Sequence, residues 1–399
     1  MRNRYAAVAL STASLFLIVM AVLVNSPPLF YMATAIIATL AGSRLQAWLA
    51  VRGLRFERSI TPAVQVGEPV TVHIIVWSER RLKRPLVSVI DHLPRRLVDR
   101  DQMVSLPVAP SFDQPIQTKY TFQPRRRGIY QWQRLTVEGT DALGLVTLKK
   151  IYTTEVAELI VYPAPIPIHT SITPSAGWGQ SELETGRSTG SGLDTRSIRN
   201  YVQGDPMRTI HWKSSAKRGT LMVKEFESGS GLTLRMILQR TSGIDVGDEQ
   251  TSVFEAMCGN ALYLTQQFLE KNALIHFPQV ESATAYLDHP SARERATSEA
   301  LTVIQPDQPL TLAQELASLK GLFADGETVV LFLCQQEALL PRMLLDMVDM
   351  QKICLVYDPK DYTQKLPSGF QSAADSNYIS QLELAGAQVI FVPRVEKLG

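Results

Sequence analysis

Hydrophobic residues follow three patterns along the chain, and the first of them fills residues 1–55. Ala6 to Val24 is uncharged throughout, and a second apolar run from Leu29 to Gly42 follows the turn signal Asn25–Pro28. Each run, extended by its neighbours, is long enough for a helix to cross a hydrocarbon core of ~30 Å. We therefore predict a transmembrane helical hairpin. A cleaved signal peptide before a buried helix is the alternative, and the immediate second run disfavours it.

Charged residues flank this hairpin and are missing from its turn. Arginine precedes it at Arg2 and Arg4 and follows it at Arg44, Arg52, Arg55 and Arg58. Because positive charge concentrates on the cytoplasmic side of membrane helices, both ends are expected in the cytoplasm. The pattern thus predicts a multi-pass protein of the cell inner (plasma) membrane, with both termini and the soluble domains cytoplasmic.

The second pattern covers residues 56–165 and consists of short β-branched runs between glycine and proline turns. It predicts strands at Val70–Trp77, Leu86–Ile90, Gln117–Phe122, Leu135–Glu138, Leu145–Leu148 and Glu158–Tyr162. Short strands at this spacing indicate an immunoglobulin-like β-sandwich. We interpret the basic cluster Arg125–Arg127 as a solvated turn or as structural ion pairs, with an anionic-lipid or nucleic-acid patch as the alternative.

Residues 166–229 are expected to be a linker followed by a charge-dense segment, and the third pattern begins at residue 230. Apolar runs that suit strands alternate there with helix-length stretches. The predicted strands are Leu232–Leu238, Ala273–Phe277, Thr328–Cys334, Ile353–Tyr357 and Ala387–Val392. The predicted helices are Asp248–Lys271, Ser291–Val303, Leu310–Leu322, Glu337–Met347 and Tyr378–Ala385. This alternation predicts a doubly wound α/β domain over residues 230–399.

Composition excludes some functions. A net charge of +2 at pH 7 does not favour nucleic-acid binding, and we expect no nucleic-acid partner. The three cysteines, Cys258, Cys334 and Cys354, form no C-x-x-C pair and are expected to be buried free thiols in a reducing compartment. The sequence contains no P-loop, no dinucleotide-binding glycine fingerprint, no H-E-x-x-H and no G-x-S-x-G motif, so we assign no catalytic residue and no cofactor.

The charge-dense segment from Gly192 to Glu227 combines basic, acidic and aromatic residues. Its prominent positions are Arg199, Tyr201, Gly204, Asp205, Arg208, His211, Trp212 and Lys213. Their order and spacing resemble the signature of the domain of unknown function 58 family, which consists of bacterial membrane proteins. Three further elements occur in the order typical of that family: Arg126–Tyr130, Asp141–Leu145 and Val161–Pro163.

The resemblance implies a membrane hairpin, a β-rich domain and a C-terminal domain similar to von Willebrand factor type A. It also implies a partner, because members are often encoded beside MoxR-type AAA+ ATPases. Metal-binding von Willebrand type A domains carry D-x-S-x-S after the first strand, whereas this chain has Gln-Arg-Thr-Ser-Gly at Gln239–Gly243 and no carboxylate in Cys334–Gln336. Because a divalent cation needs carboxylate oxygens and Arg240 would repel it, we expect no bound metal.

The segment from Gly192 to Glu227 has two interpretations. It can form an anion-binding or acid–base site, since arginine binds phosphate bidentately and histidine ordinarily titrates near neutrality. It can instead be a clasp or docking surface, with Arg208 paired to Asp205 and Trp212 held in an apolar pocket beside Ile210. We favour the second and expect a membrane-anchored, non-enzymatic scaffold or adaptor for a MoxR-type ATPase or its client. The alternative is a membrane-associated hydrolase or transferase that acts on an anionic substrate through Arg199, Asp205, Arg208 and His211.

Overall fold

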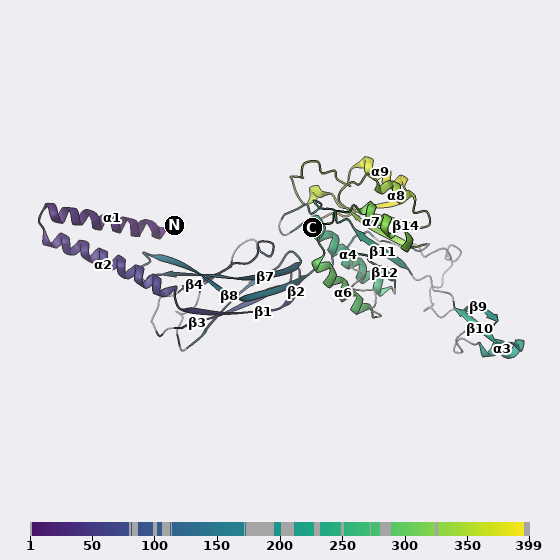
Figure 1. Cartoon of the computed structure of the whole chain (residues 1–399), viewed down its shortest axis with the longest axis horizontal. Coiled ribbons are helices and arrows are strands. Elements are labelled where there is room, and N and C mark those ends of the chain that lie inside the picture. Colours follow the sequence, from purple (N-terminus) through teal and green to yellow (C-terminus); the bar gives the residue numbers. More distant parts are fainter. Residues whose placement is uncertain are drawn as a thin grey trace. The chain divides into compact units, whose positions relative to one another are not determined.

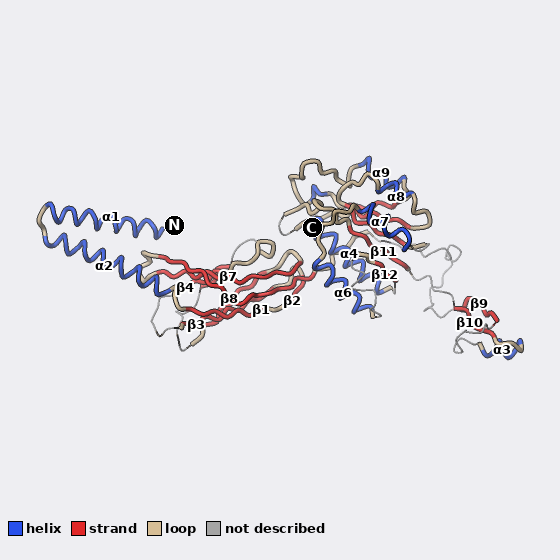
Figure 2. The backbone as a smooth tube through the Cα atoms, viewed as in Figure 1, coloured by secondary structure: helices blue, strands red, loops and turns tan. Residues whose placement is uncertain are grey.

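The computed structural model describes residues 2–79, 81, 87–98, 102–105, 112, 114–170, 172, 195–200, 211–226, 232–248, 251–271, 273–279, 289–323 and 326–394. The chain divides into two compact units. One comprises Met1–Ala164 with Glu249–Thr251, and the other comprises Pro165–Asp248 with Ser252–Gly399. Figure 1 labels the elements of both units, and Figure 2 distinguishes helices from strands.

The first unit begins with two long helices that form a hairpin, α1 (Arg2–Leu23) and α2 (Pro27–Ala50) (Figure 1). Asn25 makes the turn with a φ of 49°, a left-handed conformation that asparagine tolerates better than most residues. Pro27 and Pro28 occupy the first turn of α2, where a missing N–H costs nothing. With apolar stretches of 19 and 24 residues, both helices are long and apolar enough to cross a membrane, as predicted.

Two β-sheets follow in the same unit. The smaller has the order β1-β3-β6, formed by β1 (Leu54–Ile60), β3 (Val70–Ser78) and β6 (Ile116–Phe122). The larger has the order β2-β8-β7-β4-β5, formed by β2 (Ala63–Gln65), β8 (Thr147–Tyr162), β7 (Gly128–Thr140), β4 (Val87–Asp91) and β5 (Gln102–Ser105). Every second residue of β3 is buried, and buried side chains from both sheets form one cluster. The two sheets therefore make a β-sandwich around a shared core.

The predicted strands of this region lie in the right places but have the wrong lengths at the β7–β8 hairpin. Leu145–Leu148 and Glu158–Tyr162 overlap one strand, β8, and β7 extends far beyond the predicted Leu135–Glu138. Polar and charged side chains in the middle of β8 conceal its continuity, because half of that stretch faces solvent. The patterns also failed to predict the short strands β2 and β5 and the strand β1 that directly follows α2.

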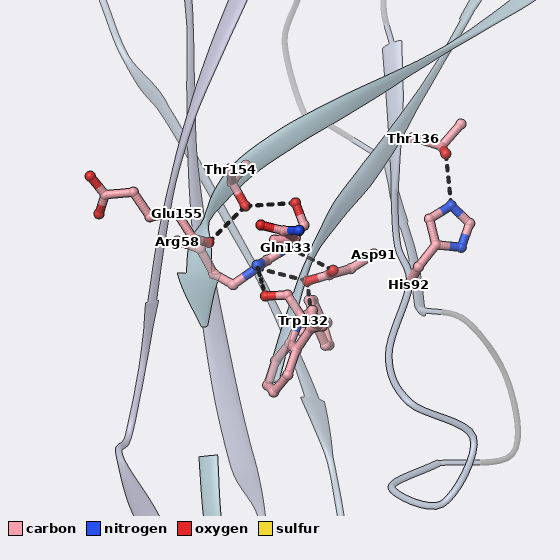
Figure 3. Close-up of polar contacts among 9 residues, drawn as sticks. Arg58, Asp91, His92, Trp132, Gln133, Thr136, Thr154 and Glu155 are labelled. Carbon is pink, nitrogen blue, oxygen red and sulfur yellow. Dashed lines mark hydrogen bonds and ion pairs between the residues drawn. The ribbon is translucent and has the colours of Figure 1, made fainter. Parts of the chain in front are cut away.

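A buried ion pair connects the two sheets of the sandwich. Arg58 of β1 donates to both carboxylate oxygens of Asp91 in β4, at 3.1 and 2.8 Å, and to the carbonyl of Trp132 at 3.3 Å (Figure 3). Tyr120 of β6 donates to the same carboxylate at 2.6 Å. Burial raises the pKa of Asp91, while the guanidinium of Arg58 and the hydroxyl of Tyr120 oppose that rise. The pair fixes which strands face each other, since a buried charge is costly without its partner.

Two of the three arginines in the basic cluster Arg125–Arg127 lie below the surface. Arg126 and Arg127 are buried, and the hydroxyl of Tyr130 donates to their carbonyls at 2.9 and 3.3 Å. Gly128, which directly follows Arg127, adopts a φ of 142°, which residues with a side chain rarely adopt. For Arg126 and Arg127, burial contradicts the predicted solvated turn and the alternative lipid or nucleic-acid patch, whereas the structural ion pairs stay a prediction. The element Arg126–Tyr130 closes the turn that leads into β7.

The second unit contains a parallel sheet with helices on both faces. Its strand order is β12-β11-β13-β14-β15, and each neighbouring pair is parallel. The strands are β11 (Thr233–Leu238), β12 (Leu274–His276), β13 (Thr328–Leu333), β14 (Gln351–Val356) and β15 (Ala387–Phe391). The helices are α4 (Val253–Glu270), α6 (Pro290–Val303), α7 (Leu312–Leu319), α8 (Leu340–Leu345) and α9 (Ser376–Leu384), with 3-10 turns η2 (Lys320–Leu322) and η3 (Pro359–Asp361).

Two hydrophobic clusters cover the two faces of this sheet. Helices α4 and α6 supply one cluster with side chains such as Phe254 and Leu301, and α7, α8 and α9 supply the other with Leu316, Leu344 and Leu382. The five strands are almost entirely buried, apart from the two at the edges, which explains their continuous apolar sequences. This is a doubly wound α/β fold, and its switch point lies between β11 and β13.

The α/β unit also includes residues that precede the signature segment. Ile166 donates its N–H to the carbonyl of Gly259 at 3.0 Å, and its carbonyl accepts from the side chain of Asn260 at 2.8 Å. Ile168 and Ile172 are buried in the cluster that contains α4. The chain therefore enters the core of this unit well before residue 230, through isoleucines that sequence patterns attributed to a linker.

Candidate functional site

The signature segment forms a small antiparallel hairpin with a helix. Strand β9 (Thr195–Asn200) pairs with β10 (Met222–Phe226), and α3 (Trp212–Arg218) precedes β10 in the chain (Figure 1). Arg199 lies in β9 opposite Val223. Tyr201, Gly204, Asp205 and Arg208 lie outside the described residues. Whether Arg199, Asp205 and Arg208 converge with His211 therefore stays a prediction.

His211 caps the N-terminus of α3. The ring Nδ1 accepts the N–H of Ser214 at 3.1 Å, and the backbone N–H of His211 donates to the carbonyl of Met222 at 2.8 Å. An accepting Nδ1 carries no proton, so a neutral ring holds its proton on Nε2. The imidazole thus satisfies one of the amides that every helix leaves without an intrahelical partner.

Ser215 connects α3 to β10 from inside the segment. Its buried hydroxyl donates to the carbonyl of His211 at 3.0 Å and accepts the N–H of Met222 at 2.8 Å. Met222 is buried as well. At the other end of α3, Gly219 has a φ of 67° and donates to the carbonyl of Ser215 at 2.9 Å, a glycine C-cap. These bonds fix the orientation of α3 on its strand.

Trp212 does not occupy the apolar pocket that we expected. It is the first residue of α3, and 64% of its surface is exposed. Lys213, in the next position, is exposed too, as are Lys217, Arg218 and Leu221. The expectation failed because aromatic character alone does not say which face of a short helix is covered. The hydrogen bonds of His211 and Ser215 fix α3, and they leave the indole on its outer side.

A second candidate region is the carboxyl end of the parallel sheet, where doubly wound folds bind ligands. Gln239 follows β11 and is fully buried. Its side-chain oxygen accepts the N–H groups of Cys334 and Gln335, both at 2.9 Å. Its nitrogen donates to the carbonyl of Gln335 at 3.0 Å and to the carboxylate of Glu337 at 2.8 Å. The amide uses both ends to join the loops that follow β11 and β13.

Glu337 is a carboxylate at this edge that sequence analysis missed. It lies one residue beyond Cys334–Gln336, and the predicted helix Glu337–Met347 includes it, whereas α8 begins at Leu340. Its oxygens accept the N–H groups of Leu312 and Ala313, each at 2.9 Å, at the start of α7. Its position shortly after a buried strand, at the switch point of the sheet, is the sequence feature from which this carboxylate could have been predicted.

Arg240 lies in the loop that follows β11, and its side chain is paired. It contacts Glu315 at 3.2 Å, and the other oxygen of Glu315 accepts from Gln279 at 3.0 Å. Gln279 also bonds the N–H and carbonyl of Leu238, at 2.9 and 2.7 Å. In the part of the chain that the structure describes, no group of three histidine, cysteine, aspartate or glutamate side chains is placed to hold a metal ion.

The cysteines are buried free thiols, as predicted. Burial raises the pKa of Cys334 and of Cys354 to about 12, so both thiols stay protonated at neutral pH. Cys258 is buried within α4. These thiols fill space in the core and do not form a nucleophilic site.

The chain thus combines an apolar helical hairpin, a two-sheet β-sandwich and a doubly wound α/β unit. The segment formed by β9, α3 and β10 precedes the parallel sheet in the sequence. Proteins with these parts form the structural class to which this chain belongs. Residues 197–317 match the family described as "Protein of unknown function DUF58". That range runs from β9 into α7. Together with the relative that follows, the match supports the resemblance of this chain to that family.

The relative is the "Uncharacterized protein YeaD" of Bacillus subtilis (strain 168), which is 27% identical over 200 residues. The match covers 47% of this chain and 48% of that protein, so the chain spans about half the length of the relative. Among solved structures, a CARDB domain from Pyrococcus furiosus is 17% identical with a TM-score of 0.20, and the match covers 27% of this chain and 91% of that domain. A β-glucosidase from Listeria innocua is 10% identical with a TM-score of 0.17, over 27% of this chain and 16% of the enzyme. These TM-scores are too low to support an argument about function.

Proposed function

We propose that this protein is a membrane-anchored, non-enzymatic scaffold or adaptor that binds a cytoplasmic protein partner through α3. The observation that carries the proposal is the exposure of Trp212 on α3, a helix whose orientation is fixed by the hydrogen bonds of His211 and Ser215. Tryptophan is enriched among the residues that dominate binding energy at protein interfaces. A large exposed indole on a helix that also exposes Lys213 and Lys217 suits a partner surface with an apolar pocket and acidic rim.

The polar residues of both candidate regions support a structural use over a catalytic one. His211 caps a helix, Gln239 joins two loops, and Glu337 accepts backbone amides at the start of α7. Each of these side chains makes hydrogen bonds to backbone groups of the protein. We therefore favour the scaffold over the hydrolase or transferase alternative, for which no described observation speaks.

We propose that the scaffold is located in the inner membrane. The two apolar helices would cross the bilayer, and the arginines on both sides of the hairpin would keep the termini and the soluble units in the cytoplasm. We also propose that the sandwich is immunoglobulin-like and that the α/β unit is a von Willebrand factor A-like domain without a metal. The proposed partner, by family resemblance, is a MoxR-type AAA+ ATPase or its client.

Replacement of the exposed indole tests the proposal. We expect Trp212→Ala, in the full chain held in lipid nanodiscs, to weaken binding of the MoxR-type ATPase of the same organism at least tenfold, a loss of about 1.4 kcal/mol or more. The measurement is equilibrium binding by interferometry. Because Trp212 is exposed, the variant should keep its folded state.

Leu384→Ala is the matched control, since Leu384 ends α9 and is 83% exposed. Removal of this apolar side chain should leave the affinity unchanged. Equal affinities of wild-type protein and Trp212→Ala would contradict the proposal that α3 is the binding surface.

A further inference from the structure

The last turns of α2 are fastened to the β7–β8 hairpin. Gln46 accepts the N–H of Ala142 at 3.1 Å, and the hydroxyl of Tyr152 donates to the carbonyl of Val51 at 2.6 Å. Ala47 and Ala50 are completely buried on this side of the helix. The helix is therefore not a free tether, and its depth in a membrane sets the depth of the hairpin.

The length of α2 places this fastening at the edge of the bilayer. The contacts of α2 with the sandwich lie at Ser43, Gln46 and Val51, and the part of the helix that precedes them is Pro27–Gly42. At 1.5 Å per residue that part is about 24 Å long, shorter than a hydrocarbon core of ~30 Å. In α1 the apolar stretch begins at Tyr5. Tyr5 and Leu45 lie equally far along the chain from the turn residue Asn25, so they lie at about the same depth in the two helices. Both helices thus put the boundary of the hydrocarbon core within the fastened stretch.

The turn between β7 and β8 presents a leucine at that level. Leu143 directly follows Ala142, and 64% of its surface is exposed. The turn is rigid, because the carboxylate of Asp141 accepts the N–H groups of Leu143 at 3.1 Å and Val146 at 2.7 Å. Gly144 supplies the left-handed residue of the turn, with a φ of 70°. Exposure of this leucine is therefore built into the turn.

Side chains typical of a membrane interface surround the same end of α2. The guanidinium of Arg52 lies 4.4 Å from the centre of the Trp48 ring. Arg44 is exposed, one residue before Leu45. Tryptophan and arginine gather at the level of lipid headgroups, where one end of the side chain is apolar and the other is hydrated or paired with phosphate.

We infer that the β7–β8 turn, Asp141–Val146, is a membrane-surface contact in which Leu143 enters the boundary between headgroups and acyl chains beside α2. The inference rests on the proposed crossing of the membrane by α1 and α2. It identifies a role for the element Asp141–Leu145: the aspartate shapes a turn that holds the sandwich against the bilayer. Motion of the sandwich relative to the membrane is restricted by two attachments, the helix and the turn.

Spin labels on the full chain test this contact. Single cysteines replace Leu143, Ile129 and Leu15, the three native thiols being buried. Ile129 is a matched control, since it is an aliphatic residue of β7, 51% exposed, and lies roughly 36 Å along the strand from Thr140. Leu15 in α1 is 64% exposed and reports whether the hairpin is embedded. The protein is reconstituted in vesicles of phosphatidylethanolamine and phosphatidylglycerol.

The measurement is the accessibility of each label to oxygen, which partitions into lipid, and to a water-soluble nickel chelate. We expect the ratio of oxygen to nickel accessibility to be severalfold higher at Leu143→Cys and Leu15→Cys than at Ile129→Cys. A label at position 143 as hydrated as the one at 129, with position 15 in lipid, would overturn the contact and leave the membrane anchor standing. A hydrated label at position 15 would refute the anchor and the contact together.

Discussion

Single polar side chains in this protein satisfy backbone groups at the ends of helices and in turns. His211 does so at the start of α3 and Glu337 at the start of α7. Asp141 does so in the β7–β8 turn, where it accepts from Leu143 and Val146. Burial alone would raise the pKa of Asp141, but the amide hydrogen bonds and one from Ser43 lower it below its usual value of 3.8.

The lowered pKa of Asp141 makes the stability of its turn depend on pH. A carboxyl group with a folded-state pKa below its unfolded value stabilises the fold fully above pH 3.8, and this contribution disappears as the pH falls through the folded pKa. We expect Asp141→Asn to accelerate hydrogen exchange in the turn roughly tenfold at pH 7, for a loss of about 1.4 kcal/mol. The ratio of variant to wild-type rates should approach one in strong acid.

Mass spectrometry of the peptide that contains residues 141–146 measures these rates. Asp346→Asn is the control, because Asp346 is exposed and its ion pair with Lys320 spans 3.6 Å, so its removal should leave all rates unchanged. A rate ratio for Asp141→Asn that stays constant from pH 7 down to strong acid would show that ionisation of Asp141 does not stabilise the turn.

At the scale of secondary-structure elements, the contact between α2 and β7 determines how the hairpin and the sandwich act as one body. Gly139 is the point of closest approach. A Cβ atom there would lie 2.7 Å from the Cβ of Ala50 and 2.8 Å from Cγ1 of Val51. Such distances are too short for carbon atoms in contact, so only glycine permits the helix to approach the strand this closely.

Gly139→Ala should therefore loosen this contact. Insertion of one methyl group into a filled site costs roughly 1–3 kcal/mol, and we expect a melting temperature several degrees lower for the full chain in detergent micelles, followed by tryptophan fluorescence. Gly42→Ala is the matched control, since nothing lies within 4 Å of a Cβ at that position in α2. Alanine is favoured in a helix, so this variant should melt at or above the wild-type temperature. The two substitutions should not have the same effect.

At the scale of the whole molecule, sequence patterns predicted the elements that are continuous apolar runs. The hairpin and the buried strands β11, β13 and β14 are long apolar runs, and such runs have few alternatives. The β7–β8 hairpin was predicted too short, because the polar middle of β8 gives no apolar run. The family signature was also visible in the sequence, and residues 197–317 match it.

Contacts between distant parts of the chain were beyond prediction. Glu337 accepts hydrogen bonds from the backbone amides of Leu312 and Ala313, which are remote in sequence. No local sequence pattern predicts such bonds. The exposure of Trp212 likewise depends on the hydrogen bonds of His211 and Ser215, which decide how a seven-residue helix is turned. Side-chain polarity predicts which residues need partners, whereas the fold decides which partners they obtain.

The proposal that α3 docks a protein partner is tested most directly by a photo-crosslinking residue at position 212 in the full chain, in membranes that also contain the MoxR-type ATPase. A crosslinker reports contact itself, independently of any change in stability. We expect a crosslinked product between this chain and the ATPase from position 212 and none from position 384, where Leu384 is even more exposed. A chain that binds the ATPase but gives no crosslink from position 212 would refute docking through α3.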